Sequence, residues 1–242
     1  LWFIKGDTNN NTLLSQNVNI WEKNASREFI ESRGLNYKQV DLGPIYGHQW
    51  RHFNAKYVDC DEDYEGKGVD QLFQIINKLK IAAQNAHIEK INEKEGWSIP
   101  KLYEDRRRLI MTAWNPQQIN EMVLPPCHIL SQFHVKDNKL SCSLYQRSGD
   151  VGLGIPFNVA SYSFLTHLLA NHCGLEAHEF IHHIGDAHIY ETHVEELNKQ
   201  IDNILYDFPK IKIKNVYNDI NLYKPNDFEV KNYKCNEAIK ME

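Results

Sequence analysis

The fold is decided by residues 125–150, which read PPCHILSQFHVKDNKLSCSLYQRSGD. Two runs in this stretch, His128–Val135 and Lys139–Gln146, are predicted to form β-strands. The residues between them, Lys136-Asp137-Asn138, are typical of a hairpin turn. The stretch therefore predicts a β-hairpin, with Cys127 at the rigid, proline-flanked entry to its first strand.

Helical and strand patterns alternate on both sides of this hairpin. Leu1–Ile4 is predicted to be the end of a helix that stops at Gly6. Further helices are predicted over Asn19–Ile30, Val69–Lys80, Asn158–Cys173 and around Val194–Ile201. Gly174 is the predicted C-terminal cap of the helix that ends at Cys173. Further strands are predicted at Leu109–Met111, Phe180–Tyr190, Lys210–Lys214 and Phe228–Val230. Residues 82–104 turn polar and are interpreted as a surface insertion. The order of elements predicts an α+β fold with a mixed sheet packed with helices.

Composition places the chain among ordinary globular proteins. Its 242 residues suffice for one domain, 42% are hydrophobic, and the net charge of -5 disfavours a general nucleic-acid grip. Its five cysteines form no CxxC pair, which favours a reducing cytoplasm over a disulfide scaffold or zinc site. No apolar run is long enough for a membrane span and no signal peptide is visible. The apolar start without Met indicates a piece of a longer polypeptide, so an upstream targeting segment stays an open alternative.

Several polar residues are candidates for chemistry, and each also has an ordinary structural explanation. Cys127 is either a buried core thiol or a reactive thiolate beside a cation. Arg147-Ser148 and the run 105–108 (DRRR) suit phosphate, but also suit a solvated surface. Asn158 is either a helix cap or a group that reads a uracil edge. The histidines match no zinc signature in their spacing; they are His182, His183, His188 and His193.

Taken in order, five motifs resemble the thymidylate synthase family. They are DLGPIYGHQWR (41–51), RRRLIMTAWNP (106–116), LPPCHIL (124–130), LYQRSGDVGLGIPFNVASY (144–162) and GDAHIYETH (185–193). Tyr57–Leu72 and Ser148–Asp150 are closer to the eukaryotic form. The resemblance runs from Leu1 to Glu242. It implies a single domain with the thymidylate synthase fold, in which one face of a twisted mixed sheet forms a dimer interface.

This resemblance implies reductive methylation of dUMP to dTMP by 5,10-methylenetetrahydrofolate, without a metal, in a homodimer. Cys127 would add to C6 of uracil, and Tyr46 and Gln146 would support proton transfer. The residues implied to bind dUMP are Arg147, Ser148, Gly149, Asp150, Asn158, His188 and Tyr190, with Arg107 and Arg108 donated by the neighbouring subunit. Those implied to bind folate are Ile20, Trp21, Asp150, Leu153, Gly154 and Phe157.

The chain also departs from the family pattern. The general-base glutamate would lie two residues before Leu1, and an upstream phosphate-binding arginine and the first strand are absent with it. The closing tail is short, and Cys235-Asn236 stands where the family has His-Pro. We therefore expect this segment alone to be nearly inactive. Three alternatives stay open: a pyrimidine hydroxymethylase, a non-catalytic nucleotide- or RNA-binding relative, and a synthase domain that follows a dihydrofolate reductase domain. The insertion at 82–104 precedes Arg107 and is expected near the dimer interface.

Overall fold

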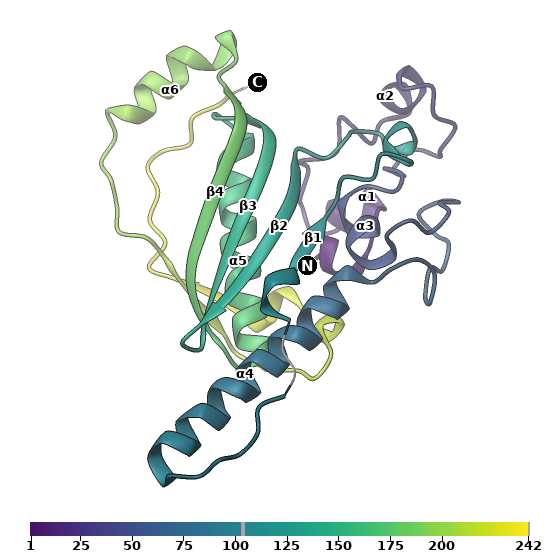
Figure 1. Cartoon of the computed structure of the whole chain (residues 1–242). Coiled ribbons are helices and arrows are strands. Elements are labelled where there is room, and N and C mark those ends of the chain that lie inside the picture. Colours follow the sequence, from purple (N-terminus) through teal and green to yellow (C-terminus); the bar gives the residue numbers. More distant parts are fainter. Residues whose placement is uncertain (103–104, 242) are drawn as a thin grey trace.

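The computed structural model describes residues 1–102 and 105–241, and at its centre lies a four-stranded sheet backed by helices (Figure 1). The strands lie in the order β1-β2-β3-β4. β1 and β2 are antiparallel, as are β2 and β3, whereas β3 and β4 are parallel. Their bounds are Ile110–Thr112, His128–Lys136, Lys139–Asp150 and Glu176–His188. The mixed sheet with packed helices confirms the predicted α+β class.

The predicted hairpin turn joins β2 to β3. Asp137 and Asn138 have φ angles of 51° and 63°, in the left-handed region that Asp and Asn tolerate better than most residues. Lys136 pairs with Lys139 across the turn. A two-residue turn of this hand matches the twist of the flanking strands, so the local sequence fixes the register of the hairpin.

Helix α5 (Gly154–Cys173) connects the parallel strands β3 and β4 and covers one face of the sheet. Parallel neighbours require such a crossover. The helix begins four residues before the predicted start and ends as predicted at Gly174, whose φ is 77°. Leu165, Leu168 and Leu169 of α5 are buried in the same core as Phe133 of β2 and Leu144 of β3. Each such leucine contributes about 1.5–3 kcal/mol through burial.

The opposite face of the sheet carries exposed apolar side chains. Side chains alternate between faces along a strand, so Leu130 and Tyr145 point away from α5, and they pair with each other across β2 and β3. Leu130 is 37% exposed and Tyr145 is 44% exposed, and Ile110 of β1 and Ile181 of β4 are exposed on the same face. A sheet with one core face and one partly apolar open face has room for a second packed layer.

Helix α4 (Gln71–Glu95) is much longer than predicted. Asp70 caps its start, with Oδ1 accepting from the N–H of Phe73 at 2.8 Å, and Gly96 ends it in a left-handed conformation. The insertion interpreted as a surface segment from residue 82 is therefore largely a continuation of α4, and Ala82 and Ala86 are buried. The C-terminal part of α4 projects from the rest of the molecule, which accounts for its polar composition (Figure 1).

The segment after Gly96 folds back along the projecting part of α4. The side chain of Asn92 both donates to the carbonyl of Ile99 (3.0 Å) and accepts from its N–H (2.9 Å). Asn85 does the same with Leu102, at 2.9 and 2.8 Å. Because these asparagines lie seven residues apart, they share one helix face and hold the returning chain in register.

The N-terminal third consists of short helices. They are η1 (Phe3–Lys5), α1 (Asn10–Leu14), α2 (Arg27–Ser32) and α3 (Tyr46–His52). The prediction of a helix end at Leu1–Ile4 corresponds to the 3-10 turn η1, which Gly6 ends with a φ of 72°. The prediction of one helix over Asn19–Ile30 is wrong. Ser26 caps α2 by accepting from the N–H of Phe29, so residues 20–25 form turns and the helix begins only after Ser26.

The C-terminal part confirms the late strands. β5 (Lys210–Ile213) and β6 (Phe228–Lys231) form a two-stranded antiparallel sheet, and α6 spans Val194–Ile201. The remaining 3-10 turns are η2 (Arg106–Arg108), η3 (Ile119–Glu121), η4 (Glu191–His193), η5 (Ile220–Leu222) and η6 (Pro225–Asp227). Within residues 1–102 and 105–241, no helix has the length and apolarity that crossing a membrane requires.

Candidate active site

Cys127 lies directly before β2, is half-buried, and is held through both its backbone N–H and its backbone carbonyl. Its N–H donates to the phenolic oxygen of Tyr46 at 2.8 Å, and its carbonyl accepts from the N–H of Arg147 at 2.8 Å. The strand register slips next to it, since His128 pairs with Gln146 but Leu130 pairs with Tyr145. This β-bulge re-aims the chain at the start of β2, a common arrangement beside functional sites.

Arg147 of β3 places its guanidinium beside the sulfur of Cys127. Its Nη2 lies 3.8 Å from the Cys127 Sγ, while its Nε donates to the carbonyl of Pro126 at 2.8 Å. The guanidinium also lies 5.7 Å from the ring centroid of Trp114. Backbone carbonyls and an aromatic face together fix the cation in one orientation. The predicted pairing of a cysteine with a nearby arginine is therefore present in the geometry.

Beneath Cys127 lies a stack of aromatic side chains. Tyr46 stacks on His128 with ring centroids 4.0 Å apart, and the Nδ1 of His128 lies 2.9 Å from the hydroxyl of Tyr162. Burial, followed by the charge of His182, lowers the pKa of His128 to about 3. Burial, followed by the charge of Cys127, raises the pKa of Tyr46. His128 is consequently neutral, and Tyr46 keeps its proton, across the physiological pH range.

A chain of polar side chains links three elements beside this stack. Gln146 of β3 donates through Nε2 to the side-chain oxygen of Asn158 on α5 at 3.0 Å, and its Oε1 lies 2.9 Å from Nε2 of His182 on β4. Gln146 is only 1% exposed, so these contacts satisfy polar atoms that water cannot reach. The structure thus brings Gln146 and Asn158 together, as expected for residues of one site.

Asp150 closes β3 and organises the following loop. Its carboxylate accepts from the N–H groups of Gly152 (3.0 Å) and Leu153 (3.2 Å), and it lies 3.6 Å from Nδ1 of His193. In the parallel register Asp150 is opposite His188. Both carboxylate oxygens of Asp150 are thereby engaged with the loop and the neighbouring element.

His188 and Tyr190 are close together, although the strand predicted to reach Tyr190 ends at His188. Tyr190 is the residue before the turn η4 and is not part of the strand. Their rings nevertheless meet edge to face, with centroids 5.3 Å apart. Among the residues described, no cluster of three His, Cys, Asp or Glu side chains is arranged to hold a metal ion.

Comparison with known proteins assigns this arrangement to a family. A family model described as thymidylate synthase matches residues 1–97 and 98–242. The chain belongs to the thymidylate synthase family. It is 46% identical to the thymidylate synthase of Homo sapiens, over all of this chain and 71% of the human protein. It is 48% identical to the bifunctional dihydrofolate reductase-thymidylate synthases of Plasmodium chabaudi and Paramecium tetraurelia. The chain spans 38% and 48% of the lengths of those two proteins.

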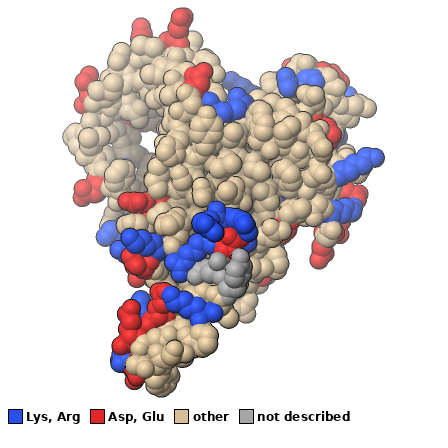
Figure 2. Space-filling model, viewed as in Figure 1, with Lys and Arg blue, Asp and Glu red and all other residues tan. Residues whose placement is uncertain are grey.

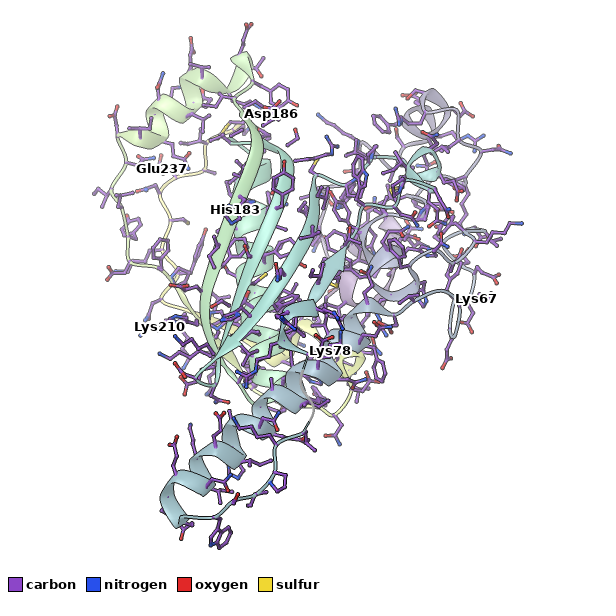
Figure 3. All side chains as sticks on the ribbon, viewed as in Figure 1. Lys67, Lys78, His183, Asp186, Lys210 and Glu237 are labelled. Atoms are coloured by element: carbon purple, nitrogen blue, oxygen red, sulfur yellow. The ribbon has the colours of Figure 1, made fainter. Side chains whose placement is uncertain are left out.

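Arg107 and Arg108 lie far from Cys127 of the same thymidylate synthase chain. They form the exposed turn η2, which Lys78 of α4 holds by donating to the carbonyl of Arg108 at 3.3 Å (Figure 3). Leu109 then pairs with Phe133, six residues along β2 from Cys127. At roughly 3.3 Å per strand residue this separation is about 20 Å. Figure 2 shows the basic side chains gathered where α4 and η2 meet the sheet.

The predicted folate contacts differ in burial. Trp21 is half-buried, with its ring 6.0 Å from that of Tyr46. Ile20, Leu153 and Phe157 are 55%, 40% and 55% exposed. Phe157 also lines an apolar cavity of about 870 Å³ between η1, α5 and the β5–β6 sheet, whose lining does not include Cys127. Gly154 begins α5, and Ser148 and Gly149 lie opposite Asp186 and Ala187 in β4.

Three polar residues of the site were not predicted from the sequence. His128 adjoins the nucleophile, His182 contacts Gln146, and His193 faces Asp150. His182 was considered only as a possible metal ligand. Its position at an inward-facing site of a strand, two residues from Phe180, was the available indication that it enters the site rather than solvent.

Proposed function

We propose that this chain is the catalytic unit of an enzyme that converts dUMP to dTMP with 5,10-methylenetetrahydrofolate, releasing dihydrofolate. The observation that carries the proposal is the half-buried Cys127 with the fixed guanidinium of Arg147 3.8 Å from its sulfur. This contact places the guanidinium beside the sulfur that would attack the nucleotide, and a cysteine nucleophile reacts as its thiolate. The same guanidinium has a hydrogen-bonding geometry suited to a phosphate oxygen of the nucleotide.

The reaction begins when the thiolate of Cys127 adds to C6 of uracil, which makes C5 nucleophilic. C5 attacks the methylene carbon of the folate, and the proton on C5 then leaves. Elimination of tetrahydrofolate leaves an exocyclic methylene, which takes a hydride from that tetrahydrofolate. Transfer of the hydride completes the methyl group and leaves the folate oxidised to dihydrofolate. The thiolate then departs from C6. Both transferred groups therefore come from the folate, and no metal is needed.

The remaining side chains have distinct roles in this proposal. Asn158 presents its amide to the uracil edge, and Gln146 holds that amide in place. The hydroxyl of Tyr46, held against the N–H of Cys127, joins a proton-transfer network. Residues near the phosphate and ribose are Ser148, Gly149, His188 and Tyr190. Residues proposed for the folate are Asp150, Ile20, Trp21, Leu153, Gly154 and Phe157.

The active unit in this proposal is a homodimer. Arg107 and Arg108 lie about 20 Å from Cys127 of their own chain, by the strand spacing given above, so they reach a phosphate only in a neighbouring copy. The open sheet face with Leu130, Tyr145 and Ile181 is the surface on which the second copy packs. A two-fold axis through this face would give each subunit the same exchange of arginines.

Subunit mixing tests the shared site. Cys127→Ala removes the nucleophile, and Arg107→Glu with Arg108→Glu removes the donated cations. In a random mixture half of the dimers are mixed, and each of these has one site free of both changes, so activity should recover to about a quarter of wild type. A mixture that stays inactive, although mixed dimers are shown to form, would contradict the exchange.

Turnover tests the proposed reaction. The protein with its natural termini should form dTMP and dihydrofolate from dUMP and methylenetetrahydrofolate in equal amounts. Cys127→Ser should abolish the reaction, whereas Cys235→Ser, at an exposed thiol, should not change it. A 5-hydroxymethyl product would assign a pyrimidine hydroxymethylase instead.

We propose a cytoplasmic location. The five cysteines of this chain are all free in the structure, which suits a reducing compartment.

A further inference from the structure

The contact of Gln146 with the backbone reveals the direction of the amide chain. Nε2 of Gln146 lies 2.9 Å from the carbonyl oxygen of Ser148 and 3.0 Å from Oδ1 of Asn158. A backbone carbonyl can only accept a hydrogen bond, so the NH₂ group of Gln146, and not its oxygen, must face Ser148. Its second proton then goes to Asn158, which must present its oxygen to Gln146.

This direction determines what His182 and Asn158 offer. The oxygen of Gln146 faces Nε2 of His182 at 2.9 Å, so that nitrogen must carry a proton. Burial, followed by the charge of His183, lowers the pKa of His182. A neutral imidazole has one N–H, and here that N–H is the one on Nε2. At the other end, Nδ2 of Asn158 points away from Gln146 and remains a donor.

We propose that His182 is a positioning residue that sets nucleobase specificity by fixing the direction of the Gln146–Asn158 amides. This inference rests on the proposed function. The outward Nδ2 of Asn158 matches the 4-carbonyl of a uracil ring, and the free lone pair of Oδ1 matches its N3–H. A cytosine ring presents a 4-amino group and an unprotonated N3, which require the opposite amide direction.

His182 makes reversal of this direction unfavourable. If both amides turned over, the NH₂ group of Gln146 would face Nε2 of His182, which would then have to move its proton to Nδ1. The oxygen of Gln146 would face the carbonyl of Ser148. With a side chain at position 182 that has no donor, only the contact with Ser148 opposes reversal. The neighbouring ring of Phe180, 5.4 Å away, shows that an aromatic replacement at 182 has apolar contacts available.

Three variants separate this role from simple packing. His182→Phe keeps a ring but removes the donor, whereas His182→Gln keeps a donor for the oxygen of Gln146. His178→Phe is the matched control, because His178 is an exposed histidine of the same strand, with its Nε2 3.9 Å from Oε1 of Glu179. The measured quantity is the ratio of the dissociation constants of dCMP and dUMP, determined on the protein with its natural termini.

We expect His182→Phe to lower this ratio about tenfold or more, the effect of losing one hydrogen bond to a buried group. His182→Gln should retain most of the discrimination, and His178→Phe all of it. An unchanged ratio in His182→Phe, or an equal loss in His182→Gln, would overturn the proposal. If wild type binds dUMP selectively but forms no dTMP, the proposed reaction fails and the specificity role of His182 is still decided by these ratios.

A second measurement needs neither variants nor turnover. Nitrogen-15 NMR of the histidine rings in the wild-type protein distinguishes the two neutral tautomers. The direction of the amides requires His182 to carry its proton on Nε2 at pH 7, and a proton on Nδ1 with a bare Nε2 would overturn the inference.

Discussion

The hydroxyl of Tyr46 gives the sharpest test of how the nucleophile is held. It accepts the N–H of Cys127 at 2.8 Å, and the Tyr46 side chain is 2% exposed. Tyr46→Phe keeps the ring stacked on His128 but leaves a buried N–H without its acceptor. Such a loss costs about 1–3 kcal/mol of unfolding free energy. For a domain of this size that corresponds to a fall in Tm of roughly 2–12 °C.

The activity should fall more than this stability loss explains. At a temperature where the variant stays folded, misplacement of Cys127 and loss of the hydroxyl from the proton network should lower kcat about 10²–10⁴-fold, the usual contribution of a proton-transfer group. The assay is kcat from dihydrofolate absorbance, beside unfolding by denaturant.

A matched control lies elsewhere in the chain. The hydroxyl of Tyr64 accepts the N–H of Val58 at 2.8 Å and donates to the carbonyl of Asp59 at 2.9 Å. Tyr64→Phe therefore removes a similar hydroxyl contact with the backbone and should have a similar cost in stability, but its kcat should stay close to wild type. Equal kcat values for the two folded variants would refute the role given to Tyr46.

Three further outcomes are expected. Gly149→Ala should lower dUMP affinity at least tenfold by calorimetry, because a Cβ would lie 3.1 Å from Nε2 of Gln146 and 3.0 Å from Ile155. Wild-type affinity in Gly149→Ala would contradict the tight packing. Because the pKa of His128 is lowered to about 3, the unfolded chain takes up a proton at a higher pH than the folded protein, so the unfolding free energy is full above pH 6.5 and falls toward pH 3. Between pH 7 and pH 5, the unfolding free energy of His128→Asn, measured by denaturant titration, should fall about 2 kcal/mol less than that of wild type. Equal falls in the two proteins would contradict the buried neutral ring. Asn85→Leu removes both hydrogen bonds to Leu102 and should lower the unfolding free energy by about 1–3 kcal/mol. An unchanged unfolding free energy would show that the segment after Gly96 is not held there.

The sequence was most informative where a local rule decides the structure. Asp137-Asn138 and Gly174 have backbone conformations that their residue types favour, so the hairpin and the end of α5 were predictable. Cys127 and Arg147 were predictable as a pair because the family motifs contain both. Their 3.8 Å contact, however, depends on the β-bulge and on the carbonyl of Pro126, neither of which has a sequence pattern of its own.

The errors arose where tertiary contacts override local composition. The helix predicted to end at Lys80 continues to Glu95, because Asn85 and Asn92 use their amides to bind the returning backbone, which makes a long helix favourable. β4 ends at His188 although Ile189 and Tyr190 are strand-forming residues. His182 belongs to the site because it contacts Gln146 on the neighbouring strand β3, and a single sequence does not reveal which residues of two strands meet.

The central claim is that the sulfur of Cys127 forms a covalent bond to the pyrimidine. Incubating the protein with its natural termini with 5-fluoro-dUMP and methylenetetrahydrofolate tests it directly, because fluorine at C5 blocks proton loss and traps the adduct. Mass spectrometry of the digested complex should find nucleotide and folate together on the peptide that contains Cys127, and no adduct with Cys127→Ser. A protein that binds 5-fluoro-dUMP but forms no adduct, or forms it at another residue, would contradict the account.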